Sequence, residues 1–72
     1  MINRFNPKKL HLSKWTAVSP ERKERHFIVS ELIKNEDDEI IACNLEAVIN
    51  KNVYEMDWAE LKNKEIWLMG WN

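Results

Sequence analysis

Glycine, cysteine and proline are scarce in this chain of 72 residues, which has one, one and two of them. A single glycine, Gly70, excludes a Gly-rich loop that cradles phosphate groups. A single cysteine, Cys43, excludes an internal disulfide, so a reducing cytoplasm is the expected compartment. No apolar run is long enough to span a bilayer, and the first ten residues do not resemble a signal peptide.

Tryptophan and charged residues are abundant instead. Hydrophobic residues make up 44% of the chain and charged residues 32%, as in ordinary globular proteins. Four tryptophans, each able to bury about 200 Å², supply much of the core that so short a chain can build. We expect an irregular arm over residues 1–12, because Pro7 excludes a central strand there, and a single small β-rich domain over residues 13–72.

The stretch from Glu39 to Trp58 has apolar side chains at alternate positions. They are Ile41, Cys43, Leu45, Ala47 and Ile49, followed by Tyr54, Met56 and Trp58. A period of two indicates strands with one buried face, so this stretch predicts a β-hairpin. A turn at Lys51 and Asn52 gives three inward pairs: Leu45 with Trp58, Ala47 with Met56 and Ile49 with Tyr54.

Two further strands are predicted before this hairpin. Residues 13–18 (SKWTAV) are rich in β-formers, with Trp15 and Ala17 on one face. Residues 26–33 are dense in β-branched and aromatic side chains, and a turn at residues 35–38 would pair them with the hairpin. In that pairing Leu32 lies opposite Ile41 and Ile28 opposite Leu45. Ser19, Pro20 and Glu21 also form a good helix start, so a helix from about 20 to 33 is the alternative.

The C-terminal part predicts a short helical turn and a last strand. Asp57 and Glu60 have the spacing of a capping box, which favours a helical turn near residues 57–62. Residues 65–69 (EIWLM) read as a strand, and Gly70 permits a bend that brings Trp71 back to the body.

These elements predict a mainly β fold: a small, strongly bent antiparallel sheet, with an SH3-like barrel as its closed form. The second face of the central strands is also apolar, with Phe27, Val29, Ile33, Ile40, Ala42, Val48 and Val53. A sheet that is apolar on both faces must be covered on both, by closure into a barrel or by a second subunit. An α+β fold with the helix at residues 20–33 is the competing architecture.

Side chains that carry chemistry are few and poorly grouped. Cys43, His11 and His26 share no recognised zinc spacing, and Cys43 is expected to be a buried, unreactive thiol. The acidic run Glu36 to Glu39 lacks the ligand pattern of a calcium loop and predicts a solvated turn. We therefore expect no catalytic residues, no cofactor and no metal, and no enzyme.

Charge is divided unevenly along the chain. Residues 1–25 carry a net charge of +5 and residues 26–72 a net charge of −6. A basic end of this kind is typical of nucleic-acid binding, although it can also dock on the acidic part of the same fold. Trp15 lies beside Lys14, and an exposed tryptophan next to a cation can stack a base. The candidate partner-binding residues are Arg4, Lys8, Lys9, Lys14, Trp15, Arg22, Lys23 and Arg25.

Several motifs of the chain resemble those of a known family. They are Asn6-Pro7-Lys8-Lys9-Leu10, Ser13-Lys14-Trp15-Thr16-Ala17-Val18, His26-Phe27, Leu45-Glu46-Ala47-Val48, Trp58 with Leu61-Lys62, and Trp67 with Gly70-Trp71. Together they resemble a tryptophan-rich family of small bacterial proteins of unknown function. The resemblance implies a free-standing bacterial protein and supplies no catalytic residues.

The leading hypothesis is a non-enzymatic binding module that contacts RNA or another anionic partner through its basic N-terminal end. The alternative is a structural or protein-interaction module, either a homodimer or a subunit of a hetero-complex. No membrane partner is expected.

Overall fold

The protein is mainly β in a computed structural model that describes residues 6–72. The elements, in chain order, are the 3-10 helix η1 (Pro7–Lys9), β1 (Lys14–Glu21), β2 (Glu24–Lys34), β3 (Ile40–Ala47), β4 (Val53–Met56), the 3-10 helix η2 (Trp58–Lys62) and β5 (Trp67–Met69). The helix considered for residues 20–33 is wrong, because β2 occupies most of that range.

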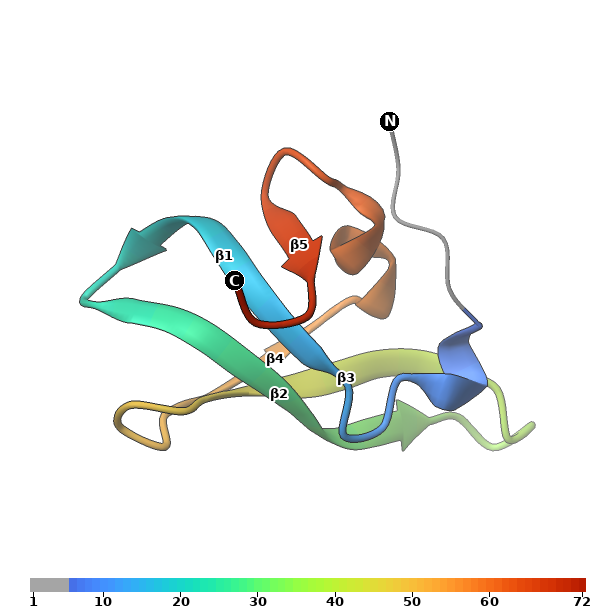
Figure 1. The fold of residues 1–72 in the computed structure, drawn as a ribbon. Coiled ribbons are helices and arrows are strands. Elements are labelled where there is room, and N and C mark those ends of the chain that lie inside the picture. The colour runs from blue at the N-terminus through green and yellow to red at the C-terminus, as the bar shows by residue number, and fades with distance from the viewer. Residues whose placement is uncertain (1–5) are drawn as a thin grey trace.

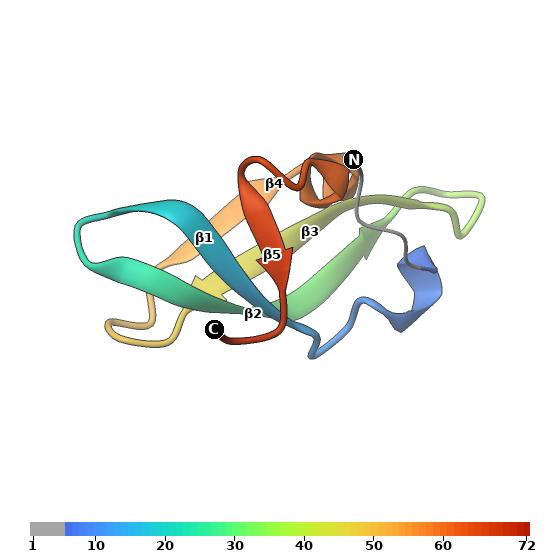
Figure 2. The same ribbon diagram turned by 45° about the horizontal axis from the view of Figure 1, so that its top comes forward.

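The five strands form one antiparallel sheet in the order β4-β3-β2-β1-β5. The sheet is strongly bent, so that β1 and β5 cross β3 and β4 obliquely in both views (Figures 1 and 2). The predicted bent antiparallel sheet is confirmed. Its closure into an SH3-like barrel is wrong, because β4 and β5 remain the two open edges.

The core fills the concave side of this bend. Its buried residues are Leu10, Trp15, Phe27, Val29, Cys43, Leu45, Ala47 and Leu61. Ala17, Leu32, Met56, Trp58 and Trp67 pack against them. The inward row predicted for the hairpin is therefore confirmed at its centre, where Cys43, Leu45 and Ala47 are buried, whereas Ile41 and Ile49 at its ends are exposed.

The hairpin of β3 and β4 keeps the predicted parity but not the predicted register. Tyr54 pairs with Leu45 and Met56 pairs with Cys43, a shift of four residues from the predicted pairs. The loop is wider than a two-residue turn: Ala47 N–H donates to the carbonyl of Asn52, and Lys51 N–H donates to the carbonyl of Ala47. A shift by an even number leaves the buried face unchanged, which is why alternation alone did not detect it.

Strands β2 and β3 contain two register shifts, and these change which side chains face the core. Val29, expected on the second face, pairs with Leu45 and is fully buried, whereas Ile28 pairs with Glu46. The register shifts between Val29 and Glu31, so that Leu32 also faces inward, opposite Cys43. An irregularity of this kind inserts an extra residue and reverses the alternation after it.

A tight turn connects β1 to β2 in place of the helix start. Glu21 pairs with Glu24, and the two residues between them, Arg22 and Lys23, have φ values of 55° and 65°. Positive φ at both central residues is the requirement of a type I′ hairpin turn, which neither residue type favours.

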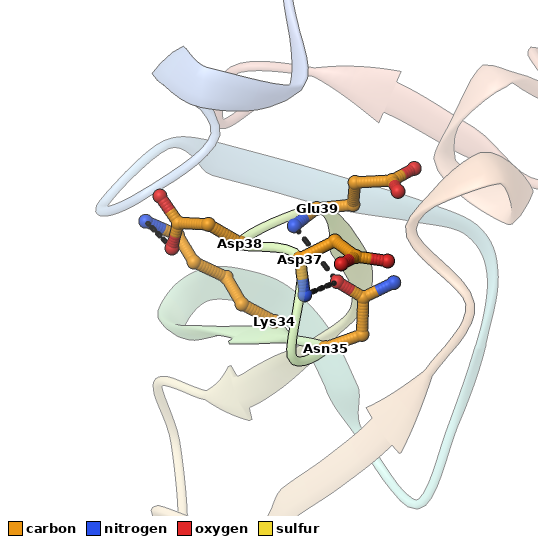
Figure 3. Close-up of polar contacts among 5 residues, drawn as sticks. All are labelled: Lys34, Asn35, Asp37, Asp38 and Glu39. Atoms are coloured by element: carbon orange, nitrogen blue, oxygen red, sulfur yellow. Dashed lines mark hydrogen bonds and ion pairs between the residues drawn. The ribbon is translucent and has the colours of Figure 1, made fainter.

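The acidic segment between β2 and β3 forms the predicted turn (Figure 3). Asn35 Oδ1 accepts hydrogen bonds from the backbone N–H groups of Asp37 (2.9 Å) and Glu39 (3.0 Å). Asp38 forms an ion pair with Lys34 at 3.4 Å on the exposed outside of the turn. The side chain of Asn35 therefore stabilises this turn by bonding to the backbone.

Residues 6–12 are less irregular than the expected arm. Asn6 caps η1, and Leu10 is 1% exposed within the core. Leu12 stays exposed, although its N–H donates to the carbonyl of Val29. The rest of the expected arm, residues 1–5, lies outside the described residues.

The helical turn near residues 57–62 is confirmed as η2. Asp57 is its N-cap, and its carboxylate accepts a hydrogen bond from Ala59 N–H at 2.9 Å. Leu61 extends from this turn into the core and is fully buried.

Candidate functional site

The C-terminal tail folds back over the start of β1. Gly70 makes the bend possible, because its φ of 82° disfavours any residue with a side chain. Its N–H donates to the carbonyl of Lys14 (2.7 Å), and its carbonyl accepts from the hydroxyl of Thr16 (2.6 Å). The same hydroxyl accepts from Asn72 N–H at 3.0 Å. Thr16, which is 1% exposed, therefore anchors both ends of the last three residues.

This bend places Trp71 on the surface, next to the side chains of Lys14 and His26. Its indole N–H donates to the carbonyl of Phe27 at 2.9 Å, which fixes the ring on β2. The His26 ring stacks with it at a centroid distance of 5.8 Å and an interplanar angle of 27°. Lys14 Nζ lies 4.7 Å from the indole centroid, and Trp71 remains 43% exposed. We call Trp71, Lys14 and His26 the Trp71 platform.

Trp15 does not serve as the exposed tryptophan of this surface. It is 1% exposed and belongs to the core, with its indole N–H donating to Ser13 Oγ at 2.8 Å. Strand alternation sends Trp15 inward while Lys14, its neighbour, stays outside and reaches Trp71 instead. The sequence signal for Trp71 was Gly70, which marks the bend.

The remaining candidate residues do not converge on one surface. Arg22 and Lys23 form the β1–β2 turn, and Arg25, next to His26, is exposed. Lys8 and Lys9 lie on η1, at the opposite end of the molecule from that turn (Figures 1 and 2). Arg4 lies outside the described residues. Lys14 is therefore the candidate cation that the structure joins to an exposed indole.

A second polar cluster surrounds Glu24, which the sequence did not single out. Its carboxylate is buried, with the residue 5% exposed, and accepts hydrogen bonds from the amide groups of Asn50 (2.9 Å) and Asn52 (3.2 Å). Tyr54 Oη lies 2.7 Å from one carboxylate oxygen and 2.9 Å from the other. These donors, Tyr54 first, lower the pKa of Glu24, and the same contact raises the pKa of Tyr54. Asn50, Asn52 and Tyr54 alternate along the chain, which is the one sequence signal that groups them.

Cys43 lies in the core, where the sequence predicted a buried thiol. It is fully buried, and burial is the main cause that raises its pKa to about 11, with smaller contributions from Asp57 and Glu60. A thiol held in its protonated form is a poor nucleophile. Over residues 6–72, no three His, Cys, Asp or Glu side chains are grouped closely enough to hold a metal ion.

The fold and the platform define a class of protein: a small all-β domain with an open, bent sheet and a tryptophan-rich core and surface. Comparison with known families makes this assignment specific. The chain belongs to the family described as Tryptophan-rich protein (DUF2389), whose profile matches residues 13–72. The predicted family resemblance is thereby confirmed, and the family has no assigned function. No curated protein and no solved structure matches the chain.

Among residues 6–72, no helix has the length and apolar character needed to cross a membrane.

Proposed function

We propose that this protein is a non-enzymatic binding module of the bacterial cytoplasm that contacts single-stranded RNA through the Trp71 platform. The observation that carries the proposal is the exposed indole of Trp71, flanked by Lys14 Nζ at 4.7 Å and by the stacked ring of His26. The exposed part of the Trp71–His26 stack, held in place by the indole hydrogen bond, is a preorganised surface for a base, and the neighbouring ammonium group is positioned for a phosphate.

The charges near the platform support an anionic partner. Lys14 and Arg25 are both exposed and carry positive charge beside Trp71 and His26. The Arg22–Lys23 turn adds two cations at the β1–β2 end of the molecule, whereas η1 contributes its lysines at the other end. A flexible single strand can follow such separated charges, because its affinity depends on the number of phosphates it places near cations.

The test is a titration of the full chain, labelled with ¹⁵N, with a single-stranded RNA oligonucleotide at low and at physiological salt. We expect saturable shifts of the Trp71 indole N–H and of the amides of Lys14 and His26, and weaker binding at higher salt. Trp71→Ala should weaken binding by about 5- to 100-fold, the effect of losing one stacked base. Absence of shifts at low salt would refute RNA binding.

Lysine variants separate stacking from simple charge attraction. Lys14→Gln should weaken binding and reduce its salt dependence. Lys62→Gln is the matched control, because Lys62 Nζ also lies over an indole, that of Trp58 at 5.0 Å. Equal losses in both variants, with no effect of Trp71→Ala, would mean that the protein attracts polyanions without using the platform.

A protein-interaction role is the second candidate. Val48 and Ile49, in the loop between β3 and β4, and Val53, at the start of β4, are 36%, 64% and 51% exposed. A homodimer that covers these side chains should dissociate on dilution and be lost in Ile49→Asp. Sedimentation velocity that shows a monomer at high protein concentration would exclude the homodimer.

A further inference from the structure

A cavity of about 420 Å³ opens on the concave side of the sheet, between its two open edges. One wall comes from β4, through Tyr54 and Met56, and the other from the start of β5 and the segment before it, through Trp67 and Glu65. Leu45 of β3 contributes to the apolar lining between these walls. The failure of the sheet to close thus leaves a site that is separate from the Trp71 platform.

Three aromatic rings from three strands meet in this cavity. Phe27 and Trp67 contact each other edge to face, with centroids 5.2 Å apart and an interplanar angle of 84°. Phe27 and Tyr54 are also arranged edge to face, at 6.4 Å and 63°. All three rings belong to the lining of the cavity, and the π electrons of an aromatic ring attract a cation that comes to lie over its face.

The charged groups in the lining are mainly acidic. Along the described part of the chain the cavity is lined by three carboxylates, those of Glu21, Glu24 and Glu65, and by the guanidinium of Arg22. The Glu24 carboxylate accepts its hydrogen bonds from uncharged groups, which orient it without neutralising it. Glu21 and Glu65 are exposed at the cavity. The electrostatic field of the cavity therefore favours a cation and opposes an anion.

Aromatic rings combined with carboxylates select one ligand chemistry. A metal ion would not use the rings, and a neutral apolar molecule would not use the carboxylates. We propose that this cavity binds a small organic ammonium ion, whose alkyl groups contact the rings of Phe27, Tyr54 and Trp67 while its charge faces Glu65 and Glu21.

The test compares two probes of the same shape, choline and its uncharged isostere 3,3-dimethylbutan-1-ol, on the full ¹⁵N-labelled chain at constant ionic strength. Choline should cause saturable shifts of the Trp67 indole N–H and of the amides of Phe27 and Tyr54. The alcohol should bind about tenfold more weakly, because it lacks the charge that the rings and carboxylates attract. Equal binding of the two probes, or no saturable shift with choline, would overturn the proposal.

A pair of glutamate variants tests the role of the cavity charge. Glu65→Gln should weaken choline binding about fivefold, since it removes one carboxylate from the lining. Glu31→Gln is the matched control, because Glu31 is exposed on β2 and does not line the cavity. Unchanged affinity in Glu65→Gln, or choline shifts centred on Trp71 and His26, would refute the proposed site. RNA binding at the platform is tested by different residues and is independent of this outcome.

Discussion

The phenol oxygen of Tyr54 lies within hydrogen-bond distance of both carboxylate oxygens of Glu24, at 2.7 and 2.9 Å. Tyr54 is on β4 and Glu24 begins β2, so this contact joins two strands that β3 separates in the sheet. Asn50 and Asn52, from the loop before β4, complete the set of donors. One ionised carboxylate thereby holds the wide β3–β4 loop against the start of β2.

Acid should weaken this contact, and Glu24→Gln should remove that part of the acid sensitivity. The folded state lowers the pKa of Glu24 from its ordinary value of 4.5, so the contact stabilises the fold above that pH. The stability is lost as pH falls through the lowered folded pKa. Thermal unfolding followed by circular dichroism should show Glu24→Gln less stable than the parent chain at neutral pH, with the difference shrinking between about pH 5 and pH 3. Glu31→Gln is the control, and a constant difference for Glu24→Gln across this range would contradict the assignment.

The β1–β2 turn offers a stabilising substitution. Lys23 has a φ of 65°, a conformation that costs a residue with a side chain about 1–2 kcal/mol and that glycine adopts freely. Because glycine also loses more backbone entropy on folding, Lys23→Gly should raise the free energy of unfolding by about 0.5–1 kcal/mol in urea. Lys9→Gly, in η1 and without a positive φ, should give no gain. Equal effects of the two substitutions would show that the turn conformation is not strained.

The sequence predicted which face of the hairpin is buried better than it predicted which residues pair. The alternation of apolar residues shows only which side chains share a face of the strand. It predicted that Cys43, Leu45 and Ala47 face the core, and all three are buried. Register depends on the loop, and the hydrogen bond from Lys51 N–H to the carbonyl of Ala47 has no signature in the hydrophobic pattern. The register shift between β2 and β3 after Val29 was also not predicted. An extra residue in β2 reverses the alternation of buried and exposed side chains, so the hydrophobic pattern of one strand resembles that of two strands.

The sequence placed the exposed tryptophan of the candidate site at the wrong residue. A lysine beside an exposed tryptophan was expected, and Lys14 does contact an indole. The indole belongs to Trp71, which is 57 positions further along the chain, because the tail returns over β1 and β2. Contacts between the two ends of a chain depend on the completed sheet, so local spacing around Trp15 could not reveal them. The Glu24 cluster was missed because two of its donors, Asn50 and Asn52, come from the β3–β4 loop and the third, Tyr54, lies on β4, whose register was not predicted.

Leu10 and Leu12 provide a matched test of how firmly residues 6–12 are held. Leu10 is 1% exposed and belongs to the core, whereas Leu12 is 58% exposed. Leu10→Ala should lower the free energy of unfolding by about 2–5 kcal/mol, the usual result of truncating a buried leucine. Leu12→Ala should change it by less than about 0.5 kcal/mol. Urea unfolding followed by circular dichroism distinguishes these values, and similar small effects would mean that this segment does not contribute to the core in solution.

Thr16 connects the stability of the sheet to the position of the Trp71 platform. Its hydroxyl donates to the carbonyl of Gly70 and accepts from Asn72 N–H, so Thr16→Val leaves two polar groups of the tail without a partner while keeping the side-chain shape. We expect a loss of about 1–2 kcal/mol in unfolding free energy and faster hydrogen exchange of the Trp71 indole N–H, which is bonded to the carbonyl of Phe27. Thr16→Ser keeps the hydroxyl and should retain the slow exchange. If exchange is equally slow in Thr16→Val, the indole is held in place without the help of Thr16, and the tail bend at Gly70 alone determines where the platform lies.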